Sequence, residues 1–377
     1  MAEDIYFSSK KPVREKPRQQ ASYTEKIDTE ALERKPGETN IGDIVTENGK
    51  ISSAVSRAPS QKNPGSRKTG KKKKSRFMPN IKKALAVFLA VIIAVTALTA
   101  SAVSYVLSDY EKSEFSENVH TDEAALLHSS SVYNVLLMGI DTLNTQSSSR
   151  SDAMILLSLD TKNGEIKLSS FLRDSYVNIP GYGNMKLNAA CVYGGPQLVC
   201  DTIEANFGIR IDDYAKVGYD MFIKIIDAVG GVTIPEIDEA EAKALKAEGF
   251  ETEPGTDIHL NGENALKYCR IRKGQNDFYR TGRQREVITL VLKKLPLSNP
   301  FRLIKTAKDI AGTIECSIEK SEFAGLLLRA LSCLSGEISQ MTVPADGTWH
   351  NATKNYQAVL VVDFEANKNL LSEFLYN

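Results

Sequence analysis

The sequence predicts one mixed α/β domain that follows a long apolar segment and a polar N-terminal region. Three observations predict this arrangement. From Tyr133 onward, short and nearly continuous apolar runs have the length of buried strands, while other runs repeat at helical spacing. Residues 84–106 carry no charge, and the residues before them are rich in Lys, Glu, Ser, Pro and Gln. Mixed strands and helices over about 245 residues are typical of a domain whose helices cover a central sheet.

Residues 1–83 are predicted to be disordered, because they hold few aromatic residues and cannot bury enough surface to offset their ordering entropy. The whole chain has 47 basic and 47 acidic residues. Residues 1–83 nevertheless carry roughly ten more positive than negative charges, and the remainder carries roughly ten more negative ones. The two ends of the chain are therefore expected to face different surroundings.

The stretch at 84–106 predicts a transmembrane helix, since about 20 apolar residues cross a bilayer core. A cleaved signal peptide would lie near residue 1, whereas about 80 residues precede this stretch. Basic residues from Arg67 to Lys83 crowd its N-terminal side, and acidic residues from Asp109 to Glu117 follow it. Because lysine and arginine beside a span stay in the cytoplasm, the tail is predicted to be cytoplasmic and the C-terminal domain extracellular. Residues 107–130 are expected to be a polar spacer with some helical character, and 131–377 to be the domain.

The domain is predicted to begin with three strands. The runs at 133–140 and 153–159 are apolar almost throughout, as expected of strands buried on both faces. A third strand at 166–172 follows turn-forming residues at 160–164, so the second and third strands are expected to form a hairpin.

The rest of the domain is predicted to alternate between helices and strands. Pro196 is expected to open a helix after Gly194 and Gly195. Residues 221–229 repeat at helical spacing, and two glycines end that helix before a short strand at 232–234. A helix at 326–334, a strand at 358–362 and a closing helix at 364–376 complete the prediction.

Five cysteines lie in the domain: Cys191, Cys200, Cys269, Cys316 and Cys333. An odd number cannot all pair within the chain, and no C-x-x-C spacing indicates zinc. Either Cys191 bridges Cys200, or all five are small buried hydrophobic residues; the second reading is favoured.

Two aspartates and an arginine form the first candidate cluster. Asp141 follows the first predicted strand, at the end where open α/β sheets place their ligands, and Asp152 precedes the second strand. Two carboxylates at strand ends suit a hard cation such as Mg²⁺. The alternative is that Asp141 caps a turn and Arg150 pairs with Asp152.

Further charged residues form two more clusters. Arg173 and Asp174 follow the third strand, and Lys186 lies beyond a Pro-Gly turn. Arg270 and Arg272 are spaced by two and would point the same way in an extended stretch.

The arginine cluster continues toward the C-terminus. Arg280, Arg283 and Gln284 have the i, i+3, i+4 spacing of one helical face. In an acidic domain, this local density of guanidinium groups predicts a phosphate or pyrophosphate site. The alternative is a solvated basic helix face.

These runs resemble the LytR-CpsA-Psr family. The matching motifs are NVLLMGID, RSDAMILLSLD, FLRDSYVNIPGYGNMKLNAACVYGG, FIKIIDAVGGV, and LNGENALKYCRIRK followed by DFYRTGRQR. The resemblance covers about residues 133–295 and implies an α/β/α sandwich with a mixed central sheet and a hydrophobic tunnel for a polyprenyl chain. It also implies a transferase that moves an anionic glycopolymer, such as teichoic acid or capsular polysaccharide, from a polyprenyl-pyrophosphate carrier to peptidoglycan. The helix with Met221, Phe222, Ile225 and Ile226 is expected either to line the tunnel or to pack in the core.

The resemblance implies roles for individual residues as well. By matching position, Asp141 and Asp152 would hold Mg²⁺, with Mn²⁺ as an alternative metal. The pyrophosphate would be held by Arg150, Arg173, Arg270, Arg272, Arg280 and Gln284, with Lys186 and Arg283 beside them. The candidate catalytic residues are Asp141, Arg173, Asp174 and Arg272, and either Asp141 or Asp174 would accept the proton of the attacking hydroxyl. Leu143 stands where the family often has an arginine, which leaves one phosphate or acceptor contact unaccounted for.

Two other functions would use the same residues. A non-catalytic receptor would bind polyprenyl-linked glycans without turnover, and a hydrolase would pass the polyprenyl pyrophosphate to water. A nucleic-acid partner is not expected, because the basic tail lacks a folded reading element and much of its charge lies beside the apolar stretch. The expected partners are therefore the lipid-linked glycopolymer, the peptidoglycan acceptor and the lipid bilayer of a Gram-positive-type envelope.

Overall fold

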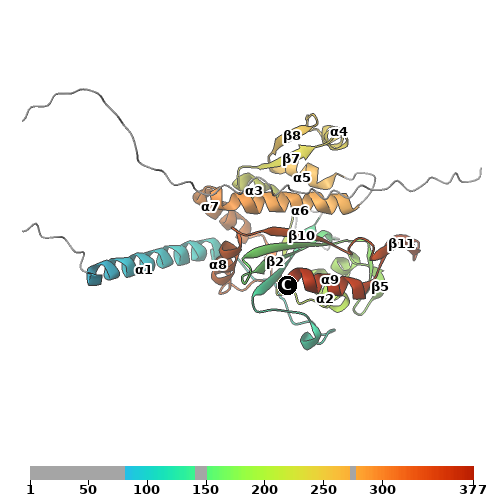
Figure 1. The fold of residues 1–377 in the computed structure, drawn as a ribbon, viewed down its shortest axis with the longest axis horizontal. Coiled ribbons are helices and arrows are strands. Elements are labelled where there is room, and N and C mark those ends of the chain that lie inside the picture. The colour runs from blue at the N-terminus through green and yellow to red at the C-terminus, as the bar shows by residue number, and fades with distance from the viewer. Residues whose placement is uncertain (1–80, 141–150, 272–276) are drawn as a thin grey trace, which may run out of the picture. The chain divides into compact units, whose positions relative to one another are not determined.

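The computed structural model describes residues 81–140, 151–271 and 277–377 (Figure 1). The predicted tail, apart from residues 81–83, and the predicted site residues Asp141, Arg150 and Arg272 lie outside the described residues. The first described helix is α1 (Ile81–Val106). None of the described helices has the length and apolar character that crossing a membrane requires.

A mixed six-stranded sheet forms the centre of the domain. Its strand order is β10-β3-β2-β1-β6-β9. β1 is antiparallel to β2, and β2 is antiparallel to β3, which confirms the three predicted strands and the hairpin. β1 is parallel to β6, β3 is parallel to β10, and β9 is antiparallel to β6. The bounds are β1 (Val132–Ile140), β2 (Ser151–Asp160), β3 (Glu165–Phe171), β6 (Asp213–Val217), β9 (Glu315–Cys316) and β10 (Ile338–Val343).

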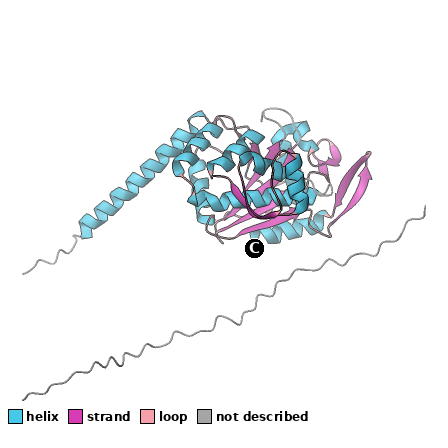
Figure 2. Ribbon diagram, turned by 90° about the horizontal axis from the view of Figure 1, so that it is seen from above, coloured by secondary structure: helices cyan, strands magenta, loops and turns pink. Residues whose placement is uncertain are grey.

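Helices cover both faces of this sheet (Figure 2). Successive side chains of a strand point to opposite faces, so neighbouring residues of β2 pack against different helices. Leu156 of β2 packs in a core with α2 (Ala189–Phe207) and α9 (Phe364–Tyr376). Its neighbour Ile155 packs in a separate core with α6 (Asp277–Lys294) and α8 (Phe323–Cys333). The layers are helix, sheet and helix, as the resemblance implies.

Two smaller sheets flank the centre. One has the order β11-β12-β4-β5, with bounds β4 (Ser175–Ile179), β5 (Gly183–Lys186), β11 (Trp349–Lys354) and β12 (Gln357–Val362). The other pairs β7 (Val232–Ile237) with β8 (Gly255–Leu260). The sequence predicts β12 and the start of β7 but not the other strands, which are short and partly polar.

The remaining helices are α3 (Tyr219–Ala228), α4 (Glu239–Ala247), α5 (Gly262–Arg270) and α7 (Pro300–Ala311). Single turns of 3₁₀ helix occur at η1 (Leu107–Asp109), η2 (Glu123–Ala125) and η3 (Leu295–Leu297). The helix expected to start at Pro196 begins earlier, at Ala189, and is kinked at Gly194 and Gly195.

The segment predicted as a spacer packs against the domain. The Tyr110 side chain is buried, and its hydroxyl donates to the carbonyl oxygens of Cys316 (2.9 Å) and Ile318 (2.7 Å). The Phe115 ring meets the Tyr214 ring edge to face, with centroids 5.4 Å apart. Ser116 and Asn118 add hydrogen bonds to Gln197 and Glu204, so aromatic and polar contacts together attach this stretch to the domain.

All five cysteines are buried free thiols, which confirms the favoured reading. Burial raises the pKa of the Cys269 thiol to about 12.

Candidate active site

Six charged side chains converge where several strands and helices begin or end. Asp152 lies at the start of β2, where Ser151 pairs with Ile140 at the end of β1. The others come from the segment between β3 and β4, from the end of β5 and from the first turn of α6. These six residues, called the charged cluster below, are Asp152, Arg173, Asp174, Lys186, Asp277 and Arg280.

Arg173 lies among three carboxylates. Its Nη1 donates to Asp152 Oδ1, and its Nε lies 3.8 Å from Asp174 Oδ2 and 3.7 Å from Asp277 Oδ2. Burial opposes the charge on Arg173, but Asp277, Asp152 and Asp174 together outweigh that effect and raise the pKa of its guanidinium. The arginine is therefore a permanent positive charge at the centre of the cluster.

Two further cations complete the charged cluster. Lys186 Nζ lies 2.7 Å from Asp174 Oδ1. Arg280 Nη2 lies 2.8 Å from Asp277 Oδ1 and donates to the carbonyl oxygen of Asp152, also at 2.8 Å. The structure thus brings together residues from the first, second and third predicted clusters, which are far apart in the sequence.

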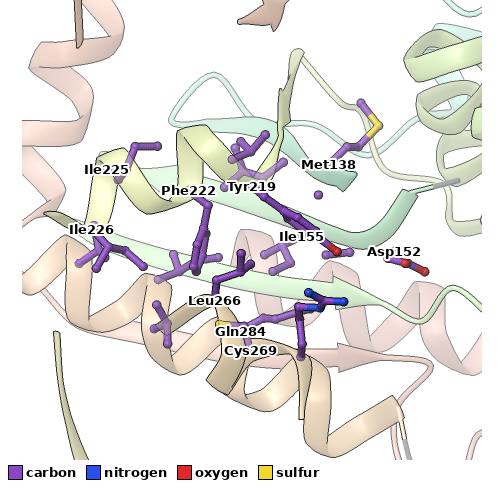
Figure 3. A pocket seen from close by; sticks show the side chains of 18 of the residues that line it. Met138, Asp152, Ile155, Tyr219, Phe222, Ile225, Ile226, Leu266, Cys269 and Gln284 are labelled. Atoms are coloured by element: carbon purple, nitrogen blue, oxygen red, sulfur yellow. The ribbon is translucent and has the colours of Figure 1, made fainter. Parts of the chain in front are cut away.

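A cavity of about 430 Å³ opens beside the charged cluster. Asp152, Arg270, Arg280 and Gln284 contribute polar groups to its lining, and most of the other lining residues are apolar. In Figure 3 the labelled side chains run from Asp152 at one end to Ile225 and Ile226 of α3 at the other. Such a cavity fits a ligand with an anionic head and a hydrocarbon tail.

Phe222, Ile225 and Ile226 line this cavity, which agrees with the first of the two roles expected for their helix. Met221 is buried but is not among the described residues that line it. Gln284 lines the cavity as well. Its buried Oε1 has no hydrogen-bond partner among the described residues, and a buried unpaired acceptor indicates a position where a ligand or water binds.

The structure corrects the expectation of an extended stretch around Arg270. This residue ends helix α5, whose N-cap Asn261 accepts a hydrogen bond from the amide of Asn264. Ala265, Tyr268 and Cys269 are buried at helical spacing, and that pattern in the sequence is the signal for the helix. Arg270 nevertheless lines the cavity.

Arg283 is placed differently from the other predicted phosphate ligands. Its Nη1 lies 2.9 Å from Glu241 Oε1, its Nη2 donates to the carbonyl oxygen of Ile271, and its guanidinium lies over the Tyr268 ring. Arg283 is not among the described residues that line the cavity. Arg283 therefore links α6 to α4 and to the C-terminal end of α5. Although Arg280 and Arg283 have i, i+3 spacing on the same helix, their side chains contact different residues.

Tyr219 and Asp277 belong to the site but are not predicted from the sequence. The Arg270 guanidinium lies over the Tyr219 ring, 5.2 Å from its centroid, and Figure 3 shows the Tyr219 side chain extending toward Asp152. Asp277 lies three residues before Arg280, and a negative charge so close to the arginines of α6 is the signal for it in the sequence.

The carboxylates of the described residues supply only part of the ligand shell that a metal ion needs. Among the described residues, no three His, Cys, Asp or Glu side chains converge in a way that would hold a metal ion by themselves. Asp152 lines the cavity and its side chain is 33% exposed. A hard cation that takes one or two carboxylates and completes its shell with substrate phosphates fits these donors.

Comparison with known proteins gives a consistent result. The model of the LytR_cpsA_psr family matches residues 91–372. The chain is 34% identical over 165 residues to the polyisoprenyl-teichoic acid–peptidoglycan teichoic acid transferase TagU of Halalkalibacterium halodurans, a match that covers 43% of this chain and about half (53%) of that protein. It is 32% identical over 244 residues to TagU of Oceanobacillus iheyensis, which covers 62% of this chain and 73% of that protein.

A solved structure has the same fold. It is the LytR-CPS2A-psr family protein YwtF (TagT) with bound octaprenyl pyrophosphate lipid, with a TM-score of 0.53 and 22% identity over 71% of this chain and 98% of that one. Because the family model spans well over half of the 377 residues, the chain belongs to the LytR-CpsA-Psr family.

Proposed function

We propose that this protein transfers an anionic glycopolymer from a polyprenyl-pyrophosphate carrier to peptidoglycan. One observation carries the proposal: a cluster of cations and carboxylates opens into an apolar cavity of about 430 Å³. A pyrophosphate with a polyprenyl tail matches both parts, since guanidinium groups pair with phosphate oxygens and apolar side chains receive the tail. The names of the TagU relatives and the lipid bound in TagT support the same class of donor.

In the proposed reaction, a sugar hydroxyl of the acceptor attacks the phosphorus atom that carries the glycopolymer. A bond forms between the hydroxyl oxygen and this phosphorus, and the bond from the phosphorus to the bridging oxygen breaks. Polyprenyl phosphate leaves with the bonding electron pair, and the hydroxyl proton passes to Asp141 or Asp174. Negative charge grows on the bridging oxygen, so positioned cations lower the barrier.

Arg270 and Arg280 are placed to bind the pyrophosphate, because both line the polar end of the cavity. Arg173 holds Asp152 in place through a direct ion pair. Asp174 already accepts from Lys186, so proton transfer to it would require this pair to loosen. Arg150 and Arg272, which lie outside the described residues, are proposed as further phosphate ligands.

Mg²⁺, or Mn²⁺, is proposed as the metal of this site, held by Asp141 and Asp152. When bound, it would neutralise phosphate charge. A cytoplasmic tail, a membrane anchor at 84–106 and an extracellular domain are proposed on the charge distribution of the sequence alone.

Transfer by the purified chain tests the proposal. Polyprenyl-pyrophosphate-linked glycan, peptidoglycan and Mg²⁺ are supplied, and both polyprenyl phosphate release and glycan attachment are measured. Asp152→Asn and Arg272→Ala are expected to lower turnover by roughly 100-fold or more, the usual effect of removing one group that stabilises charge in the transition state.

Arg210→Ala serves as the matched control, because Arg210 pairs with Glu123 away from the cavity and its side chain is 40% exposed. It should retain full turnover. Full activity of both site variants would contradict the assigned site, binding of the donor without product would indicate a receptor, and release without attachment would indicate a hydrolase.

A further inference from the structure

The connection between α6 and α7 exposes two large apolar side chains. Leu297 of η3 is 88% exposed and Phe301 of α7 is 81% exposed. Exposed cations, Lys293, Arg302 and Lys305, lie on both sides of them in the sequence. These five residues are called the apolar corner below. Large apolar residues at this exposure, flanked by positive charge, are unusual in a domain that otherwise carries a negative excess.

The apolar corner lies beside the apolar end of the cavity. Leu292 of α6 lines the cavity, and the same stretch of chain reaches Leu297 five residues later. On the other side, α7 packs against α3, whose Ile225 and Ile226 line that end. The corner is therefore next to the apolar end of the cavity, where Figure 3 labels Ile225 and Ile226, and away from the end at Asp152.

A second apolar surface lies near the corner. Helix α8 exposes Leu327 (47%), Leu328 (68%) and Leu331 (54%). Both α7 and α8 contact the C-terminal part of α1, and Figure 1 shows them at the end of the domain where α1 joins it. Val103 and Val106 of α1 belong to the same small core as Leu326 of α8.

We infer that the apolar corner docks on the surface of an anionic lipid bilayer. Exposed Leu and Phe side chains enter the boundary between headgroups and acyl chains, and flanking Lys and Arg pair with anionic headgroups. A protein partner would leave the one-sided positive charge unexplained, whereas a bilayer uses both features. The docked corner also places the apolar end of the cavity at the membrane. If the proposed function holds, on which this step rests, a polyprenyl tail then passes from the bilayer to the cavity without crossing water.

Fluorescence of the full chain in lipid nanodiscs tests the inference. Phe301→Trp places a tryptophan on the apolar corner. Tyr356→Trp is the matched control, because Tyr356 is also fully exposed but lies on the hairpin between β11 and β12. The native Trp349 contributes the same background to both variants. The discs contain phosphatidylglycerol, with or without bromine on the acyl chains as a contact quencher.

Brominated lipid is expected to quench the added fluorescence of Phe301→Trp by about twofold and to leave that of Tyr356→Trp unchanged. Adding Arg302→Glu and Lys305→Glu to Phe301→Trp should remove about half of this quenching or more, since the charge that attracts the headgroups is reversed.

Equal quenching of the two tryptophans, or none at position 301, would overturn the inference. A blue-shifted but unquenched signal at 301 would overturn it too, because it would mean that protein, such as a second copy of this chain, covers the corner. The measurement involves no turnover, so it separates failure of membrane docking from failure of the proposed transfer.

Discussion

Tyr219 joins the apolar and charged parts of the site. Its ring supports the Arg270 guanidinium, and its side chain extends toward Asp152 from the first turn of α3, which also carries the apolar lining residue Phe222. The ring and the hydroxyl therefore have separable tasks. The ring packs against an arginine, and the hydroxyl end extends toward Asp152, where the proposed pyrophosphate would bind.

Two substitutions separate these tasks. Tyr219→Phe keeps the ring beneath Arg270 and is expected to lower kcat by roughly 10-fold, the effect of losing one hydrogen bond to a charged group, with little change in KM for the donor. Tyr219→Leu also removes the ring and should raise that KM as well. Steady-state kinetics with the lipid-linked donor measures both values, and identical behaviour of the two variants would contradict the division.

At the scale of single elements, two glycines differ in whether the local backbone conformation requires glycine. Gly195 lies at the kink of α2 with φ 64° and ψ −158°, a conformation that is essentially restricted to glycine. Gly282 lies inside α6, and a Cβ there would meet nothing within 4 Å. The kink turns the first turns of α2, so that Ala190 and Cys191 as well as Val199 and Ile203 reach one core.

Gly195→Ala is expected to destabilise the domain by about 1–3 kcal/mol through backbone strain. Gly282→Ala should stabilise it by about 0.5–1 kcal/mol, because alanine loses less conformational entropy in a helix. Urea denaturation followed by circular dichroism gives both free energies of unfolding. Equal shifts for the two variants would mean that the kink is not what requires glycine.

The elements also show what the sequence can predict. Strands β1, β2 and β3 are predictable because they are buried on both faces and therefore apolar along their length. Strands β5 and β11 are mostly exposed or half-buried, so their sequences do not differ from those of loops. Helix α5 is short and is not among the predicted helices, and only the stretch from Arg270 to Arg272 at its end is expected to be extended, although the buried positions of α5 have helical spacing.

The candidate site is predictable to a similar degree. Charge and strand ends pointed to Asp152, Arg173, Asp174, Lys186 and Arg280, which the fold does bring together. The same reasoning cannot tell Arg280 from Arg283, because both have the same residue type and nearly the same helical position. The contacts of Arg283 with Glu241 on α4, the carbonyl oxygen of Ile271 and the Tyr268 ring make the difference, because they hold its side chain away from the cavity lining.

At the scale of the whole molecule, buried carboxyl groups make the stability depend on pH. Burial raises the pKa values of Asp201, Glu204 and Asp212 above their ordinary values. At pH values just above the ordinary carboxyl range the folded state then holds more protons than the unfolded state, so lowering the pH toward that range favours folding. Asp160 acts in the opposite sense. Burial opposes its charge, but Asn163 and Lys167 lower the pKa, so its contribution is lost only as the pH falls below 3.8.

The free energy of unfolding is therefore expected to rise as the pH is lowered from 7 toward the ordinary carboxyl range, and to fall below pH 3.8. Glu204→Gln should flatten this rise, because it removes one of the carboxyl groups whose pKa is raised. Glu251→Gln, at an exposed ion pair with Lys246, should leave it unchanged. Denaturation curves at several pH values provide the comparison, and a slope that Glu204→Gln does not alter would assign the pH dependence to other groups.

The five unbridged sulfur atoms have a practical consequence. No covalent cross-link between cysteines holds this fold, so neither thiol-oxidising enzymes nor an oxidising compartment is needed to form it. Overproduction in a reducing cytosol should give the same packing, and reductant in the buffers should leave the melting temperature unchanged.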